Sequence, residues 1–204
     1  MSILDRITVP ADLRRLSMDE LGELCADLRR RIVESVAANG GHLSSNLGVV
    51  ELTVALHYVY SFGPYPQGPD RLLFDVGHQC YAHKMLTGRA GGFASLRRRG
   101  SISGFPSPLE SPYDLFQVGH AGTAISCALG LARADALLGR RSRVVAVVGD
   151  ASIVNGMAFE GLNHAAGAGR QLLIVLNDNG MSIGRPQGAL AAYLERIRVS
   201  TTYN

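Results

Sequence analysis

The chain has 204 residues, of which 47% are hydrophobic and 18% charged, with 20 Lys and Arg against 17 Asp and Glu. The high apolar and low charged fractions exclude an intrinsically disordered chain. No apolar run reaches the ~18 residues of a membrane-spanning helix, and the N-terminal stretch lacks the apolar segment of a secretory signal. A chain of this length is expected to bury a full hydrophobic core.

The net charge of +3 does not by itself indicate a nucleic-acid partner. The densest basic clusters, at 29–31 and 97–99, are short and have no interleaved aromatic side chains that could stack on bases. We therefore expect a solvated basic surface, with no nucleic-acid and no membrane partner. Three widely spaced cysteines without a Cys-x-x-Cys motif indicate a reducing, cytoplasmic setting, in which Cys25, Cys80 and Cys127 are small core residues.

A capping box opens the first predicted helix, because Ser17 is followed three residues later by Glu20. Apolar residues then recur every three or four positions, and Asn39 with two glycines after it ends the helix. A second apolar helix is predicted over 48–60 and a short buried strand over 71–76. The Gly-, Pro- and Ser-rich stretch 91–111 is expected to be mostly loop.

The second half of the chain alternates helices with continuous apolar strands. Helices are predicted over 123–138 and 157–168, and strands over 143–148 and 171–176. Strands that are apolar throughout are typical of a parallel sheet covered on both faces. The fold class is therefore α/β, with a doubly wound parallel sheet.

Oxygen-bearing side chains follow two of these strands where ligands collect in open parallel sheets. Asp150 closes one strand, Gly149 before it lets the backbone approach a phosphate, and Asn179 lies just past the next strand. Carboxylate and amide oxygens, together with phosphate oxygens and water, suit Mg²⁺. The spacing is typical of thiamine-diphosphate enzymes. The alternative is an ordinary strand-to-helix turn followed by a polar loop.

Longer segments favour the first interpretation, because almost the whole chain resembles the amino-terminal part of the 1-deoxy-D-xylulose-5-phosphate synthases. The matching segments are LDRITVPADLRRLS at 4–17, GGHLSSNLGVVELTVALHYVY at 40–60, DVGHQCYAHKMLTGR at 75–89, ISGFPSPLESPYDLFQVGHAGTAIS at 102–126, GDASIVNGMAFEGLNHA at 149–165 and LNDNGMSI at 176–183. Transketolases share the thiamine signature but lack the long segments around 75–89 and 102–126.

The resemblance implies a magnesium ion and a thiamine diphosphate cofactor. The implied metal ligands are the side chains of Asp150 and Asn179 and the backbone carbonyl of Met181. Backbone groups of Ala151 and Ser152, after Gly149, would contact the diphosphate.

Three histidines beside glycines complete the implied site. His42 would lie over the reacting carbon and handle protons, and His120 is the second catalytic candidate. His78 and the turn Gly119-His120-Ala121 would contact the cofactor. For each histidine the alternative is a hydrogen-bonded core or loop residue.

The implied reaction is the decarboxylative condensation of pyruvate with glyceraldehyde 3-phosphate in a homodimeric, cytoplasmic enzyme. Two alternatives stay open: a related thiamine-dependent ketol transferase or paralogue with other substrates, and a non-catalytic module of the same fold. Two departures bear on them. Ala151 stands where the family has glycine, and Ala121-Gly122 stand where it usually has two serines.

Length sets a further expectation, since synthases of this family are about three times longer. We expect residues 1–204 to be a partial amino-terminal diphosphate-binding domain that lacks the pyrimidine-binding and carboxy-terminal domains. The isolated chain is then expected to be inactive.

Overall fold

A computed structural model describes residues 2–167, 171–178 and 187–200. Three parallel strands form one sheet in the order β1-β2-β3: β1 is Arg71–Phe74, β2 is Val144–Gly149 and β3 is Leu172–Asn177. All three lie within the predicted strands or within one residue of them. The predicted strand 71–76 ends early because Val76 and Gly77 turn the chain with positive φ angles of 59° and 86°.

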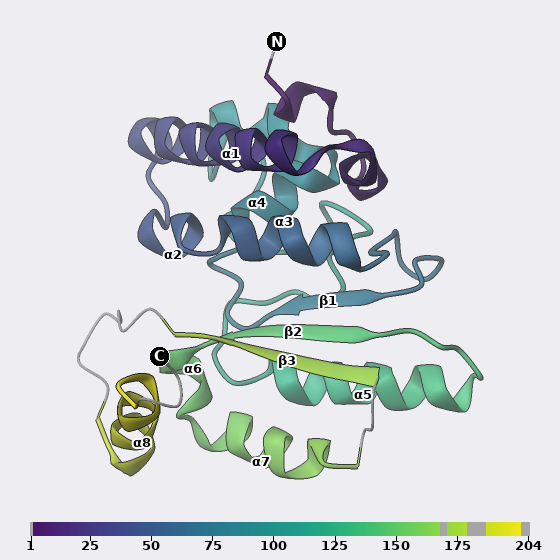
Figure 1. Cartoon of the computed structure of the whole chain (residues 1–204), viewed down its shortest axis with the longest axis vertical. Helices are drawn as coiled ribbons and strands as arrows, with labels where there is room; N and C mark the ends of the chain where they lie inside the picture. The colour runs from purple at the N-terminus through teal and green to yellow at the C-terminus, as the bar shows by residue number, and fades with distance from the viewer. Residues whose placement is uncertain (1, 168–170, 179–186, 201–204) are drawn as a thin grey trace.

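Helices cover both faces of the sheet, which confirms the doubly wound α/β class (Figure 1). On one face lie α1 (Met18–Asn39), α3 (Val50–Val59) and α4 (Tyr81–Lys84), and on the other lie α5 (Ala124–Leu137) and α7 (Gly156–Ala165). The remaining helical segments are α2 (Ser44–Leu47), α6 (Asp150–Ile153), α8 (Ala189–Arg198), three 3₁₀ turns at Leu4–Arg6, Pro10–Arg15 and Ala90–Ser95, and a π turn at Met85–Arg89.

The capping box predicted for the first helix is present. The Glu20 backbone N–H donates to Ser17 Oγ at 3.2 Å, and the Ser17 N–H donates to the Glu20 carboxylate at 2.9 Å. Gly40 ends α1 with a φ of +74°, a conformation that favours glycine. The four predicted helices correspond to α1, α3, α5 and α7, whereas the sequence patterns did not predict α8 or the short segments.

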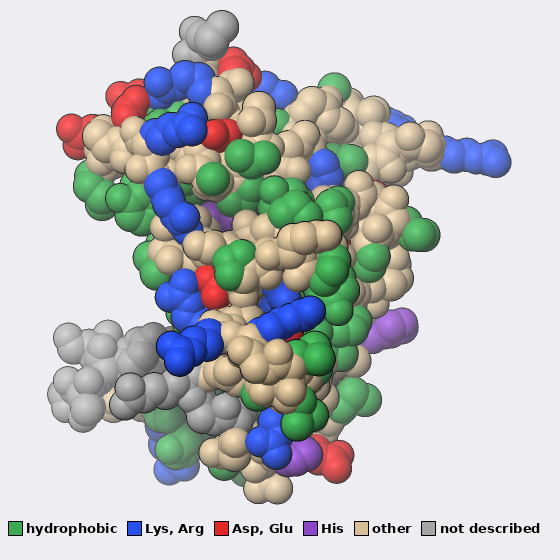
Figure 2. Space-filling view, turned by 90° about the vertical axis from the view of Figure 1, so that its right-hand side faces the viewer, with side chains coloured by type: hydrophobic (Ala, Val, Ile, Leu, Met, Phe, Trp, Pro, Cys, Tyr) green, Lys and Arg blue, Asp and Glu red, His purple; other side chains and the backbone are tan. Residues whose placement is uncertain are grey.

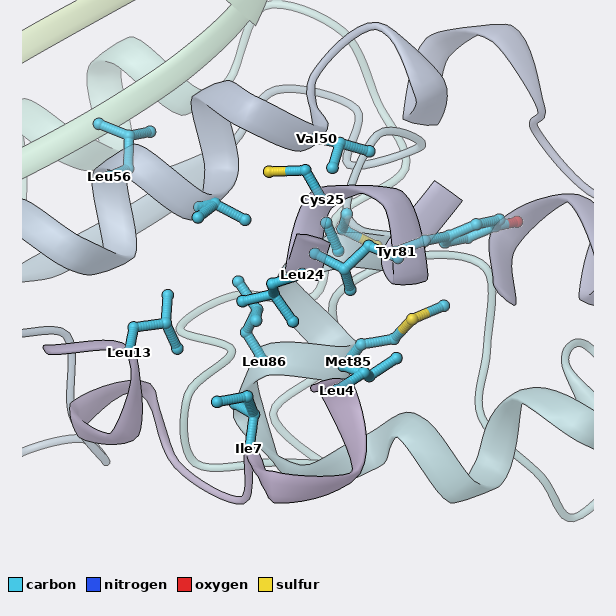
Figure 3. Packing of buried hydrophobic residues seen from close by; sticks show 14 of the residues in the cluster. Leu4, Ile7, Leu13, Leu24, Cys25, Val50, Leu56, Tyr81, Met85 and Leu86 are labelled. Atoms are coloured by element: carbon cyan, nitrogen blue, oxygen red, sulfur yellow. The ribbon is translucent and has the colours of Figure 1, made fainter. Parts of the chain in front are cut away.

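The core is divided in two by the sheet. The larger cluster lies between the sheet and α1, α3 and α4, and Figure 3 shows part of it. Leu24 and Cys25 of α1 point there toward Val50 of α3 and toward Met85 and Leu86 after α4. The smaller cluster joins the other face of the sheet to α5 and α7 through short side chains such as Ala128 and Ala158. Burial of both faces explains the apolar residues of β1 and β2, whereas the residues of β3 are half-buried or exposed.

The prediction that the cysteines are core residues is confirmed for Cys25 and Cys80. The three cysteines form no disulfide, Cys25 and Cys80 are buried, and Cys127 is half-buried. Burial raises the pKa of the Cys80 thiol to about 12, which keeps this thiol protonated and unreactive near neutral pH.

A line of buried polar side chains runs through the larger cluster. His57 Nε2 lies 3.0 Å from His83 Nδ1, and His83 Nε2 lies 3.0 Å from the Asp114 carboxylate. Arg89 donates to both carboxylate oxygens of Asp114, at 2.6 and 2.9 Å, and the Ser107 N–H donates to it at 2.8 Å. These bonds attach the loop 106–118 to α3, α4 and the π turn.

The surface carries its positive charge in separate places. On the face in Figure 2, Lys and Arg side chains are spread singly or in small groups among apolar and neutral atoms. Arg29 forms an ion pair with Glu51, and Arg30 forms one with Asp27. Among the described residues, no helix combines the length and the apolar character needed to cross a bilayer.

Candidate cofactor site

The carboxyl ends of β2 and β3 lie side by side. The two strands are paired in register, with Gly149 opposite Asn177, so the next residues, Asp150 and Asp178, leave the same edge of the sheet. Figure 1 shows this edge at the left, where α6 follows β2. The strand ends are adjacent, as the sequence predicted.

The electrostatics at this edge favour a cation. Burial raises the pKa of Asp150, and the neighbouring Asp178 charge raises it further. A positive ion would relieve the repulsion between the two carboxylates, and oxygen ligands of this kind suit Mg²⁺. The other two predicted metal ligands, Asn179 and Met181, lie outside the described residues. The described residues contain no group of three His, Cys, Asp or Glu side chains placed to hold a metal.

The turn after β2 accommodates Ala151, the residue that stands where the family has glycine, without strain. Ala151 lies in α6, is exposed, and is not among the residues with positive φ. Its methyl group therefore costs no backbone strain, because alanine adopts helical dihedral angles freely. Ser152, the other predicted diphosphate contact in this turn, is buried.

His42 and His78 are brought together, although 36 positions separate them in the sequence. Their ring centroids lie 5.5 Å apart, and Phe105 lies 5.5 Å from His42 on another side. The Nδ1 atoms of both histidines are buried, and neither has a hydrogen-bond partner within the described part of the chain. Burial lowers the pKa of both imidazoles, and for His42 the charges of His78 and Arg97 lower it further. Both rings are therefore neutral near pH 7, each with an unused Nδ1.

Asn46 positions this pair and was not identified from the sequence. Its Nδ2 donates to the backbone carbonyls of His42 and His78, at 2.6 and 2.8 Å, and its Oδ1 accepts the Tyr81 N–H at 2.9 Å. The Asn46 side chain is fully buried, so these three bonds replace water for every group involved.

We expect Asn46→Ala to lower the free energy of unfolding by at least about 2 kcal/mol, because buried backbone groups lose their partners. Chemical denaturation measures this loss. Asn39→Ala is the matched control, since the Asn39 amide binds two carbonyls nearer the surface, and it should cost less than about 1 kcal/mol. Equal losses in the two variants would contradict the positioning role of Asn46.

The turn that carries His120 is attached to the end of β1 by a buried carboxylate. Asp75 accepts the N–H groups of Gly122 and Ala124, at 2.8 and 3.0 Å, and so fixes the start of α5. Gly119 and Gly122 have positive φ angles of 138° and 88°. His120 itself is exposed, and no ring contact joins it to the pair formed by His42 and His78 among the described residues.

Asp75 directly follows the observed strand β1, as Asp150 follows β2. The predicted strand 71–76 contained Asp75, so the rule that identified Asp150 did not identify Asp75. A tight fit also holds this edge together. A Cβ on Gly77 would lie 2.5 Å from Pro106 and 2.7 Å from Val118, so the loop 106–118 packs directly on the end of β1. No sequence pattern predicts that contact.

A parallel sheet with helices on both faces and polar side chains at its carboxyl edge makes this a doubly wound α/β protein. The solved transketolase from Leishmania mexicana has this fold: it superposes with a TM-score of 0.70 over 82% of this chain and 28% of its own, at 23% identity. At that identity the likeness shows the fold alone.

The particular family is shown by the sequence comparisons. The family model described as 1-deoxy-D-xylulose-5-phosphate synthase matches residues 4–204. Proteins of that name from Dechloromonas aromatica and Porphyromonas gingivalis are each 52% identical over 99% and 100% of this chain. The chain belongs to the 1-deoxy-D-xylulose-5-phosphate synthase family. It spans about a third of the length of these relatives, 32% and 31% respectively.

Proposed function

We propose that this chain is the diphosphate-binding part of an enzyme that condenses pyruvate with glyceraldehyde 3-phosphate, with loss of CO₂, to form 1-deoxy-D-xylulose 5-phosphate. The cofactors proposed are thiamine diphosphate and Mg²⁺. The family membership supports the reaction. The observation that carries the proposal is the register of β2 and β3, in which Gly149 lies opposite Asn177, so that Asp150 and Asp178 leave the same edge of the sheet.

The metal is proposed to bind at this edge through Asp150, Asn179 and the backbone carbonyl of Met181. The raised pKa of Asp150 supports this, because burial and the neighbouring Asp178 both disfavour its negative charge and a bound cation would stabilise it. The N-termini of α5 and α7 lie on the same side as the carboxyl edge (Figure 1), and their N–H groups favour an anion there. Gly149, Ala151, Ser152 and Gly119-His120-Ala121 are proposed to contact the diphosphate with backbone groups.

His42 and His78 are proposed to face the reacting end of the cofactor. A neutral imidazole can accept a proton, and the lowered pKa values of both rings favour the neutral form. Thiamine diphosphate, when bound, supplies the electron sink that decarboxylation requires. His120 is the second proposed catalytic residue, and its exposed position leaves it accessible to substrate.

The rest of the enzyme is proposed to come from the further two-thirds of length found in the relatives. The proposal also includes a homodimer, a cytoplasmic location and a place at the start of isoprenoid precursor synthesis. The isolated segment 1–204 is proposed to be inactive, because it would lack the groups that those other domains supply.

Two measurements on the protein as its gene encodes it test this function. Calorimetric titration with thiamine diphosphate should show binding that requires Mg²⁺, and incubation with pyruvate and glyceraldehyde 3-phosphate should release CO₂ and the five-carbon product. Binding without turnover would indicate the non-catalytic module, and faster turnover with another aldehyde would indicate a related ketol transferase. Absence of Mg²⁺-dependent binding would refute the proposal.

A further inference from the structure

The side chain of Asn155 fills the space beside Gly122 where a side chain of residue 122 would lie. A Cβ placed on Gly122 would overlap both the Nδ2 and the Oδ1 atom of Asn155. Gly122 also has a φ of +88°, so a side chain there would be strained as well as obstructed. The amide of Asn155 and the bare backbone of Gly122 therefore fit each other as a pair.

One end of that amide is occupied and the other is free. Asn155 is the N-cap of α7, and its Oδ1 accepts the Ala158 N–H at 2.8 Å. The need for an acceptor at this bond identifies Nδ2 as the other atom of the amide. Within residues 2–167, 171–178 and 187–200, nothing accepts a hydrogen bond from Nδ2, and Asn155 is only half-buried.

The free donor stands between the two segments to which the proposed function assigns the diphosphate. On one side is the turn 119–122, which Asp75 holds in place through the Gly122 N–H. On the other side is α6, which ends at Ile153, two residues before Asn155. The amino end of α7 adds its unpaired N–H groups on the same side as the carboxyl edge of the sheet (Figure 1).

We propose that Asn155 is a diphosphate-binding residue whose Nδ2 donates to a phosphate oxygen of thiamine diphosphate. It thereby supplies, from α7, a side-chain contact that residue 122 cannot make because it is glycine. This inference rests on the proposed function and deepens it by adding one residue to the anion site.

Asn155→Ser tests the donor without disturbing the helix, because serine is an equally good N-cap but its hydroxyl is too short to reach over Gly122. Calorimetric titration of the gene-encoded protein with thiamine diphosphate and Mg²⁺ should show a dissociation constant at least about 10-fold higher than that of the wild type, since a hydrogen bond to a charged group is lost. The melting temperature without cofactor should stay unchanged. Asn155→Asp keeps the cap and the shape but adds a negative charge, and it should weaken binding further.

A second pair of variants tests the fit between the two residues. Gly122→Ala should lower the melting temperature of the cofactor-free protein, and the same change made in an Asn155→Ala background should lower it less. The strain from the φ angle is common to both backgrounds, so the difference reports the overlap alone.

The outcomes separate this inference from the function on which it rests. Wild-type protein that shows no Mg²⁺-dependent binding would refute the proposed function itself. Wild-type binding together with an Asn155→Ser affinity within twofold of it would overturn only the role of Asn155. A weakened affinity with an unchanged melting temperature supports the role, because a merely structural residue would change both.

Discussion

Asp150→Asn is expected to weaken Mg²⁺-dependent binding of thiamine diphosphate by at least about 100-fold, beyond the 10–100-fold typical of residues that only orient a metal ligand. The substitution keeps the shape of the side chain but removes the charge that a hard cation requires. Calorimetric titration of the cofactor at fixed Mg²⁺ measures the loss, and activity should fall with it.

The same variant should be no less stable than the wild type when cofactor and metal are absent. The pKa of Asp150 is raised by burial and by Asp178, so ionisation of this carboxyl group costs more free energy in the folded protein than in the unfolded chain. A neutral amide removes that cost. Glu160→Gln is the control, since it removes an exposed carboxylate from α7 nearby and should leave binding unchanged. Retention of tight binding by Asp150→Asn would exclude this residue as a metal ligand.

The largest loss of stability is expected for Asp114→Asn. The Asp114 side chain is fully buried and neutralises Arg89, whose side chain is 10% exposed and lies 2.6 Å away. Removal of one partner of a buried pair costs about 3–5 kcal/mol, and the Glu110 carboxylate that Arg89 would keep lies farther away, at 3.7 Å. Urea denaturation measures the loss. Glu51→Gln breaks the more exposed ion pair of Glu51 with Arg29 and should cost less than about 1 kcal/mol.

The pH dependence of unfolding gives a second measure of the same network. Burial alone would raise the pKa of Asp114, but hydrogen bonds from His83 and Arg89 outweigh it and hold the pKa well below the ordinary value of 3.8. A depressed pKa adds stability above the unfolded value that is lost as the pH falls below it. The wild type should therefore lose stability below about pH 3.8 more steeply than Asp114→Asn. Parallel curves for the two proteins would contradict the role of Asp114.

The buried histidines of the network, His57 and His83, also make the protein less stable as the pH falls, but from a higher pH. Burial lowers the pKa of both His57 and His83 from 6.5, so protonation favours the unfolded chain and stability should begin to fall below that pH. The histidine effect begins at a higher pH than the Asp114 effect, and Asp114→Asn removes the direct contribution of Asp114 below about pH 3.8.

Much of the fold could be predicted because its signals are local or periodic. The capping box joins Ser17 to Glu20 three positions later, and the apolar runs of β1 and β2 correctly indicated strands that are buried on both faces. The adjacency of Asp150 to the end of β3 also followed from sequence, since consecutive parallel strands joined by a helix end at one edge.

Contacts between distant segments needed the tertiary structure. The bond from Asn46 to the His78 carbonyl joins residues 32 positions apart, and the bond from the Gly122 N–H to Asp75 joins residues 47 positions apart. A single asparagine or aspartate has no periodicity, so nothing in the sequence distinguishes these from ordinary loop residues.

The sequence by itself determined the class of fold, the strand ends and the family, because these depend on hydrophobic periodicity and on long matching segments. Only the tertiary structure decided that Ala151 is unstrained, that His42 and His78 pair while His120 stays exposed, and that Asn155 fits over Gly122. Such features depend on dihedral angles and on close approach between separate loops, which are set by the packing of the whole chain.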